Sequence, residues 1–184
     1  MPVAVSEPVQ IGRSIIRLVR DDITQLEVDA FVFYARPDLA LGTGVGTAIS
    51  QRGGPSIQQE LNGIGPIQTG QAVVSGAGNL KASYIVHAVG PRFNERDTEG
   101  KLRTTVISAL QAAEGKGVKR IALPPMGAGF YGVPLDVCCR AMLQSIQTYL
   151  RGDTKIEEVV LCAMDQREFA PFASQLALLN RQEG

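Results

Sequence analysis

Residues 120–150 read RIALPPMGAGFYGVPLDVCCRAMLQSIQTYL and place a strand, a glycine-rich loop and a helix in direct succession. The apolar run 120–125 predicts a buried strand. The segment 124–134 holds three glycines between prolines, so it offers mostly backbone and contributes little to a core. Beyond Pro134, apolar residues recur at helical spacing through Val137, Ala141, Met142, Ile146 and Leu150. A strand followed by a helix is the repeating unit of α/β folds.

The same alternation extends over the rest of the chain. Short runs rich in β-branched residues predict further strands at 14–20, 30–35, 71–77, 84–89 and 158–164. Amphipathic segments predict helices from about residue 45, over 55–65, over 98–117 and, in the last segment, after Pro171. We therefore expect a three-layer α/β/α sandwich in which helices cover both faces of a mixed, mostly parallel central sheet.

The length and the charge of the chain limit the number of domains and the kinds of partner that it can have. The 184 residues suit one domain, which we expect over 14–181, with 1–13 as an N-terminal arm or edge strand and the last residues as a frayed tail. Eighteen basic and eighteen acidic residues balance, without a block of like charge. Neither sequence-specific nucleic-acid binding nor a membrane role is therefore expected. No signal peptide and no apolar run of ~18 residues is evident.

Cysteine and histidine are scarce. Cys138, Cys139 and Cys162 are an odd number without C-x-x-C spacing, and His87 is the sole histidine. Neither a disulfide framework nor a metal site is expected, no cofactor is implied, and the cytoplasm is the simpler setting. His87 lies in the middle of a predicted strand, so we interpret it as a core residue with satisfied polar atoms.

Three features follow strands of the predicted sheet, where ligands bind in open α/β folds. Asp22 follows the first long strand, LGTGVGTAI (41–49) follows the second, and the glycine loop 124–134 follows the fifth. Glycines let backbone N–H groups approach an anion, and a helix N-terminus adds partial positive charge. Two such loops at one edge can hold a pyrophosphate, while a carboxylate at Asp22 can accept a hydrogen bond from an adenine amino group.

Each feature also has an ordinary interpretation. A glycine loop can be only a tight turn, Asp22 a turn or cap residue, and Tyr131 a partly buried core aromatic. A dinucleotide oxidoreductase is disfavoured, because no G-x-G-x-x-G directly joins a strand to a helix with an acid about twenty residues later.

Four segments together resemble the macro domain family, which binds ADP-ribose, over residues ~14–180. They are DDIT with VDAFV (21–32), GTGVGTAI (42–49), TGQAVVSGAGNLKASYIVHAVGP (69–91) and LPPMGAGFYGVPLDVCCRAM (123–142). The resemblance implies that backbone donors hold the pyrophosphate, from Gly127, Ala128, Gly129 and Phe130 on one side and Gly44, Val45 and Gly46 on the other. It further implies that Asp22 and Ile23 bind adenine and that Tyr131 lines the pocket of the distal ribose.

The chain departs from the family's hydrolases at three places. Those enzymes usually read N-A-A-N after the second strand, and here Phe33-Tyr34-Ala35-Arg36 stands there. Their frequent water-positioning Asp is replaced by Gly46, and an aromatic that stacks on adenine is replaced by Met164, which can pack softly on a ring. The resemblance therefore implies a protein that binds ADP-ribose or an ADP-ribosylated molecule with little hydrolysis.

Two alternatives stay open. The first is a hydrolase of ADP-ribosyl esters (mono-ADP-ribosyl-protein or O-acetyl-ADP-ribose) that uses Asp38, Tyr131 and a bound water. The second is a protein-interaction domain whose pocket Phe33, Tyr34 and Arg36 close. For Arg36 itself, a contact with a phosphate or ribose competes with a simple ion pair to Asp38. The oligomeric state and pathway are not determined by these residues.

Overall fold

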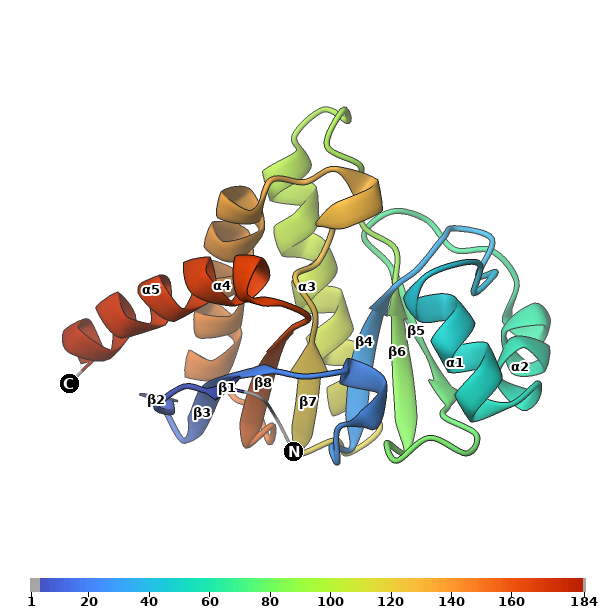
Figure 1. Cartoon of the computed structure of the whole chain (residues 1–184), viewed down its shortest axis with the longest axis horizontal. Helices are drawn as coiled ribbons and strands as arrows, with labels where there is room; N and C mark the ends of the chain where they lie inside the picture. The colour runs from blue at the N-terminus through green and yellow to red at the C-terminus, as the bar shows by residue number, and fades with distance from the viewer. Residues whose placement is uncertain (1–3, 184) are drawn as a thin grey trace.

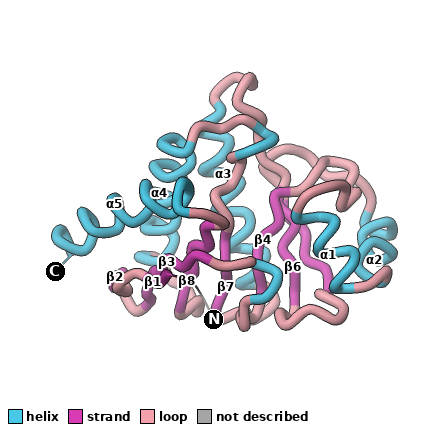
Figure 2. Tube along the Cα trace, viewed as in Figure 1, coloured by secondary structure: helices cyan, strands magenta, loops and turns pink. Residues whose placement is uncertain are grey.

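The computed structural model describes residues 4–183 and shows one mixed sheet with helices on both faces (Figures 1 and 2). The strands are β1 (Ala4–Val5), β2 (Val9–Ile11), β3 (Ser14–Arg20), β4 (Ala30–Tyr34), β5 (Ala72–Gly76), β6 (Tyr84–Ala88), β7 (Arg120–Leu123) and β8 (Glu158–Ala163). The helices are α1 (Val45–Gly53), α2 (Ser56–Ile64), α3 (Thr98–Glu114), α4 (Leu135–Arg151) and α5 (Gln166–Glu183). Two 3₁₀ turns, η1 (Ile23–Gln25) and η2 (Gly129–Tyr131), lie in loops.

The central strands run parallel in the order β3-β8-β7-β4-β6, and β5 and the N-terminal strands pair antiparallel at the two edges. The prediction of a mixed, mostly parallel sheet is confirmed. Strand β8 is buried along its whole length, as its continuous apolar run requires when helices cover both faces. All five parallel strands therefore end at the same edge of the sheet, and the loops after β4, β6 and β7 gather there (Figure 1).

Alternate side chains of the strands enter two separate cores. In β4, Val32 packs with α3, α4 and α5, whereas Phe31 packs on the other face with residues of α1 and α2. Both side chains are about 1% exposed, so each face of the sheet is covered where they lie. The three-layer arrangement follows from this alternation and is the one predicted.

The N-terminal segment pairs with the sheet. Strands β1 and β2 run antiparallel along the same strand, β3, with Ala4 opposite Arg20 and Val9 opposite Ile16. Val9 and Ile11 are buried against α5 and α4. The part of the predicted arm at residues 1–3 lies outside the described residues.

The start of the last helix was predicted wrongly. Helix α5 begins at Gln166 and contains Pro171, rather than starting after it, and it continues through Glu183. The Asp165 carboxylate accepts a hydrogen bond from the Glu168 amide (2.9 Å), and the Glu168 carboxylate accepts one from the Met164 amide (2.8 Å). These reciprocal bonds resemble a capping box and start the helix one turn before the proline.

His87 is a core residue, but its polar atoms are not all satisfied. The side chain is fully buried in β6, and its Nε2 lies 2.8 Å from Ser75 Oγ. The Ser75 hydroxyl also lies 2.9 Å from the Gly76 carbonyl, so a hydroxyl that donates there leaves Nε2–H to donate to Ser75. Nδ1 has no hydrogen-bond partner among the residues that the structure describes. Burial lowers the pKa of His87 to about 4, and the ring is neutral at pH 7.

Candidate functional site

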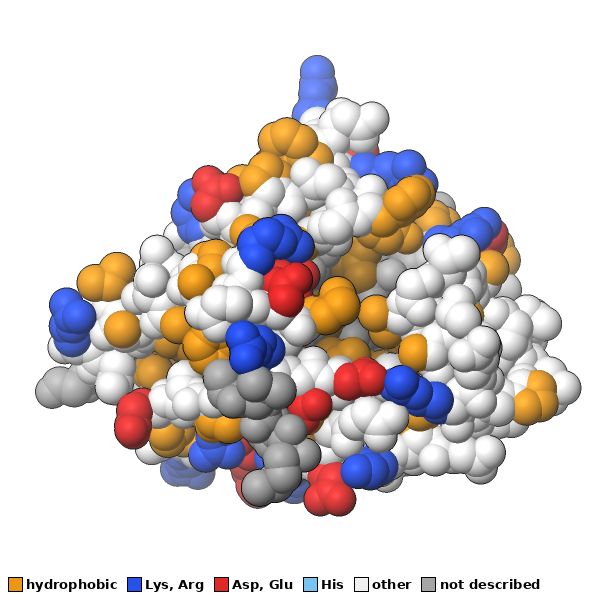
Figure 3. Space-filling model, in the orientation of Figure 1, with side chains coloured by type: hydrophobic (Ala, Val, Ile, Leu, Met, Phe, Trp, Pro, Cys, Tyr) orange, Lys and Arg blue, Asp and Glu red, His pale blue; other side chains and the backbone are white. Residues whose placement is uncertain are grey.

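The parallel strands arrange the predicted site residues in a line along the carboxyl edge of the sheet. Following the strand order from β3 to β6, the residues after each strand are Asp22, Met164, the loop 124–134, Arg36 and Arg92. At about 4.8 Å between neighbouring strands, this line spans roughly 19 Å. Figure 3 shows a hollow in the same face, with hydrophobic side chains gathered on its floor. An elongated ligand fits such an edge better than a compact one.

The loop after β7 presents its backbone to this edge. Gly127, Gly129 and Gly132 have φ of 88°, 77° and 78°, values that favour glycine. A Cβ atom on Gly127 would press on Val133, whereas one on Gly129 would meet no atom within 4 Å. Within residues 4–183, no atom accepts a hydrogen bond from the amides of Gly129 or Phe130. Those two N–H groups are available to an anion.

The base of this loop is anchored in the core. The Val133 amide donates to the Gly127 carbonyl (3.0 Å), and the Cys138 thiol donates to the Met126 carbonyl (3.1 Å). The Ala128 amide already donates to Pro125 (3.3 Å), so it is a weaker candidate donor than its neighbours. The loop therefore holds its free amides in place before a ligand arrives.

The predicted donors in the loop before α1 are of two kinds, amides without an acceptor and an amide that already donates within the protein. The amides of Gly44 and Val45 have no acceptor in the described part of the chain, and Gly44 has φ of 64°. The Gly46 amide instead donates to the Thr43 carbonyl at 3.2 Å, and a Cβ atom on Gly46 would collide with the Leu41 carbonyl oxygen. Gly46 thus permits close packing of α1 on its own loop, and the position has no room for a side chain.

Asp22 caps η1 and pairs with a helix. Its Oδ1 accepts hydrogen bonds from the amide (3.0 Å) and hydroxyl (2.7 Å) of Thr24, and its Oδ2 contacts Arg52 of α1. Burial alone would raise the pKa of Asp22, but the hydrogen bonds from Thr24 and Arg52 outweigh it and lower the pKa. The side chain is 42% exposed, and a carboxylate has about four acceptor positions, so a ligand amino group can still bind.

Two neighbours of Asp22 fit the same end of the edge. The Ile23 amide has no acceptor within residues 4–183, although the Ile23 side chain is buried. Met164 follows β8, which pairs with β3, and its side chain is 69% exposed. An exposed thioether beside a free amide and a carboxylate can receive a flat heteroaromatic ring.

Arg36 and Asp38 form an exposed ion pair at the other end, with Nη2 and Oδ2 2.7 Å apart. This is one of the two interpretations that the sequence allowed for Arg36. The pKa of Asp38 is lowered by the hydrogen bond from the Ala40 amide and by Arg36, so Asp38 is a weak base. Burial raises the pKa of Tyr131 despite opposing effects of Arg92 and Arg36, and its phenol stays protonated at pH 7.

Phe33 and Tyr34 have packing partners within the protein. Phe33 lies edge-on to His87, with ring centroids 6.0 Å apart. The Tyr34 hydroxyl donates to the Pro91 carbonyl (2.5 Å), and the Tyr34 ring lies 4.8 Å from the ring of Tyr131. A Cβ atom on Gly90 would collide with the Tyr34 ring, so that glycine makes room for it. Tyr34 is therefore held in place by Pro91 and packs against the ring of Tyr131.

Two arginines at this edge were not predicted from the sequence. The Arg92 guanidinium lies 5.6 Å from the ring centroids of both Phe130 and Tyr131, and Arg52 meets Asp22. The position of Arg92 just after a parallel strand was a usable signal. No local signal identifies Arg52, because its contact joins segments thirty residues apart.

Other features of the described chain do not compete with this edge. Residues 4–183 contain no cluster of His, Cys, Asp and Glu side chains that could hold a metal ion. None of the described helices is long and apolar enough to cross a membrane. Two open grooves, about 760 Å³ between α3 and α4 and about 670 Å³ beside β1 and η1, include no residue of either glycine loop.

Comparison with known proteins places this chain among related sequences. The model of the macro domain family matches residues 35–142. A macro domain-containing protein of Caldanaerobacter subterraneus subsp. tengcongensis is 37% identical over 172 residues, which cover 90% of this chain and 98% of the relative. A macro domain-containing protein of Listeria monocytogenes is 38% identical over 159 residues, covering 82% and 90%.

Solved structures share the fold. A structure of the Oceanobacillus iheyensis macrodomain with ADP superposes with a TM-score of 0.91 at 23% identity and covers 97% of this chain and 98% of its own. The Trypanosoma brucei macrodomain in complex with ADP-ribose superposes with a TM-score of 0.82 at 28% identity, covering 88% of this chain and 68% of its own.

Proposed function

The chain belongs to the macro domain family, and on that premise we propose that it binds ADP-ribose along the carboxyl edge of its sheet. The observation that carries this proposal is the pair of glycine loops whose free amides, at Gly44 and Val45 and at Gly129 and Phe130, border one edge. Backbone N–H groups of this kind bind phosphate oxygens without a basic side chain. The ADP-ribose and ADP in the two similar structures are consistent with the same ligand here.

We propose that the ligand lies with its adenine near β3 and its distal ribose near β4 and β6. Asp22 and the Ile23 amide would bind the adenine edge, and Met164 would pack on the ring. Gly44, Val45, Gly129 and Phe130 would bind the pyrophosphate, with Gly127, Ala128 and Gly46 shaping the two loops. Tyr131 and Arg36 would meet the distal ribose. The roughly 19 Å between the ends of the edge suits a ligand with this sequence of groups.

We further propose that the protein is a reader of ADP-ribose with little hydrolase activity. Arg36 occupies the position of the family's ribose-orienting Asn, and Gly46 that of its water-positioning Asp. The crowding of Gly46 against Leu41 supports this proposal, since a carboxylate there would need a shifted backbone. Without a positioned base, assistance worth roughly 10²–10⁴-fold is lost. The lowered pKa of Asp38 makes it a poor substitute.

Two measurements test the proposal. Titration of ADP-ribose by calorimetry should give saturable binding to one site. Incubation with mono-ADP-ribosylated protein and with O-acetyl-ADP-ribose should release little product. Absence of binding would favour the protein-interaction alternative with a closed pocket. Turnover of roughly 1 s⁻¹ or more would favour the ester hydrolase and direct attention to Asp38 and Tyr131.

A cytoplasmic location remains part of the proposal. Cys138, Cys139 and Cys162 are free and buried, and burial raises the pKa of each thiol to about 12. Protonated, buried thiols are compatible with a reducing compartment.

A further inference from the structure

We propose that Arg92, in cation–π contact with Phe130 and Tyr131, recognises an acidic side chain of the protein that carries the ADP-ribosyl group. We call these three residues the Arg92 rim. The inference rests on the proposed function, because it concerns what lies beyond the distal ribose. It names the chemistry of the carrier: a peptide with Asp or Glu next to the modified residue.

The Arg92 rim lies at the end of the site where the distal ribose is expected. Arg92 follows β6, the strand beyond β4 in the sheet order, so it stands at the far end of the edge from Asp22. With adenine at Asp22 and the pyrophosphate over β7, the distal ribose reaches β4 and β6. A group attached to that ribose leaves the site beside Tyr131 and Phe130.

The Arg92 rim combines an exposed aromatic surface with a guanidinium that has no carboxylate partner in the described chain. The Arg92 guanidinium lies 5.6 Å from the centroids of both aromatic rings, and these rings are edge-on to each other at 5.6 Å. Phe130 is 84% exposed. In the described chain, no carboxylate forms an ion pair with Arg92, whereas Arg36 nearby is paired with Asp38. A guanidinium in cation–π contact can still donate its N–H groups, and these match a carboxylate in two parallel hydrogen bonds.

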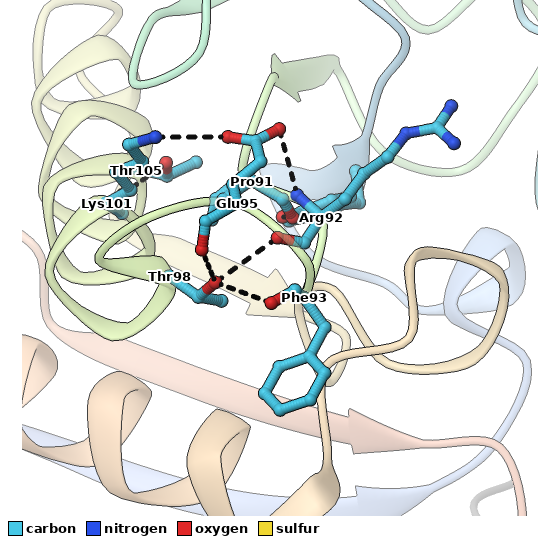
Figure 4. A network of polar contacts seen from close by, with 8 residues as sticks. Pro91, Arg92, Phe93, Glu95, Thr98, Lys101 and Thr105 are labelled. Atoms are coloured by element: carbon cyan, nitrogen blue, oxygen red, sulfur yellow. Dashed lines mark hydrogen bonds and ion pairs between the residues drawn. The ribbon is translucent and has the colours of Figure 1, made fainter.

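The loop that carries Arg92 is held by its own contacts (Figure 4). The Thr98 hydroxyl lies 2.8 Å from the Glu95 carbonyl and 3.0 Å from the Phe93 carbonyl. The Glu95 carboxylate accepts a hydrogen bond from the Arg92 amide (3.2 Å) and pairs with Lys101 (3.3 Å). The Phe93 amide donates to the Tyr131 carbonyl (3.1 Å), which joins this loop to η2.

Figure 4 shows the Arg92 side chain extending away from this network, and not into it. Glu95, the acid three residues after Arg92, is already engaged with Lys101 and the Arg92 backbone. The backbone of Arg92 is therefore held by the loop, and its guanidinium has no ion-pair partner in the described chain. Binding an acidic side chain there orders few additional groups, so little entropy opposes it.

The test compares two peptides that carry ADP-ribose through a non-hydrolysable linkage. They differ only in the residue next to the modified one, which is Glu in one and Lys in the other. The wild-type protein should bind the Glu peptide about threefold to fivefold more tightly than the Lys peptide, the upper part of the range of an exposed ion pair. Arg92→Gln should remove the preference and Arg92→Glu should reverse it. Salt at 1 M should also weaken it.

Lys81→Glu provides the matched control, because it makes the same charge reversal before β6, at the opposite edge of the sheet. Its preference for the Glu peptide should equal that of the wild type. Equal affinity of the wild-type protein for both peptides, with free ADP-ribose still bound, would overturn the role of Arg92 and leave the proposed function intact. Failure to bind free ADP-ribose would overturn both.

Discussion

Gly129 and Gly117 both have a positive φ but lie at opposite ends of the strands. Their φ values are 77° and 73°, and a Cβ atom on either would meet no atom within 4 Å. A valine at either position costs about 1–2 kcal/mol of backbone strain. Only at Gly129 would the side chain enter the space where a pyrophosphate approaches. We expect Gly129→Val to weaken ADP-ribose binding roughly tenfold or more, since charge-assisted hydrogen bonds are lost.

Gly117→Val separates that effect from strain. Calorimetric titration of both variants, with thermal unfolding alongside, should give similar stability losses and a binding loss only in Gly129→Val. Equal binding losses would mean that strain alone weakens binding. Full affinity in a folded Gly129→Val protein would remove this loop from the phosphate site.

Asp22 has a structural role that must be separated from its role in binding. Its carboxylate caps η1 through Thr24, so Asp22→Ala should lower the free energy of unfolding by about 1 kcal/mol. The same change should weaken ADP-ribose binding by ~1.5–3 kcal/mol, the worth of a charge-assisted hydrogen bond. Asp22→Asn keeps a good cap and should lose only about 1 kcal/mol of binding.

Ribose-5-phosphate is the control ligand for Asp22, because it lacks adenine. Its affinity should change little in either variant when measured by the same titration. If both ligands lose equal affinity, Asp22 does not contact the base.

At the scale of elements, the strands were predictable and the start of the last helix was not. Strand β3 occupies 14–20, as predicted, because it is a short apolar run rich in β-branched residues and charged residues flank it. For α5, the sequence predicted a helix only after Pro171, but Asp165 and Glu168 form an earlier start signal. The D-x-x-E spacing was visible in the sequence, and its competition with Pro171 was not resolved by local propensity alone.

Pro171 therefore lies inside a helix, where it lacks the N–H that would bond the carbonyl four residues earlier. We expect Pro171→Ala to raise the free energy of unfolding by about 2 kcal/mol. Alanine is favoured by about 3 kcal/mol in a helix interior, and the more flexible unfolded chain offsets about 1 kcal/mol of that. Denaturant unfolding measures the change.

A decrease in stability would show that α5 depends on the proline. The Pro171 carbonyl accepts a contact from the Cys139 thiol (3.7 Å), which alanine can preserve. Ala173, two residues later in the same helix, offers Ala173→Pro as the reverse change, and it should destabilise the protein.

At the scale of the whole molecule, the sequence predicted that Asp22 and the two glycine loops share one edge of the sheet, but not which side chains meet there. The positions of Asp22 and the two glycine loops after strands followed from the parallel order. The contact of Arg52 with Asp22 and of Arg92 with Phe130 depends on how α1 and the loop after β6 pack in three dimensions. The same holds for Gly46, whose crowding comes from the path of its own loop.

His87 couples folding of the whole molecule to pH. As the sole histidine, it dominates side-chain titration between pH 7 and 5. Its pKa is about 4 in the folded protein because it is buried, against about 6.5 in an unfolded chain. Between these two pKa values the unfolded chain binds a proton at His87 and the folded protein does not. The contribution of His87 to the free energy of unfolding is therefore fully present above pH 6.5 and declines as the pH falls toward 4.

Linkage gives the size of this decline. Lowering the pH from 7 to 5 should reduce the free energy of unfolding by about 2 kcal/mol, measured by urea unfolding at each pH. His87→Gln is neutral throughout and retains a donor for Ser75, so its stability should stay nearly constant over this range. NMR of the wild-type ring provides a second measurement, with a midpoint near pH 4. A midpoint near 6.5, or wild-type stability that does not change between pH 7 and 5, would contradict a buried, neutral His87, because protonation would then cost the folded protein nothing.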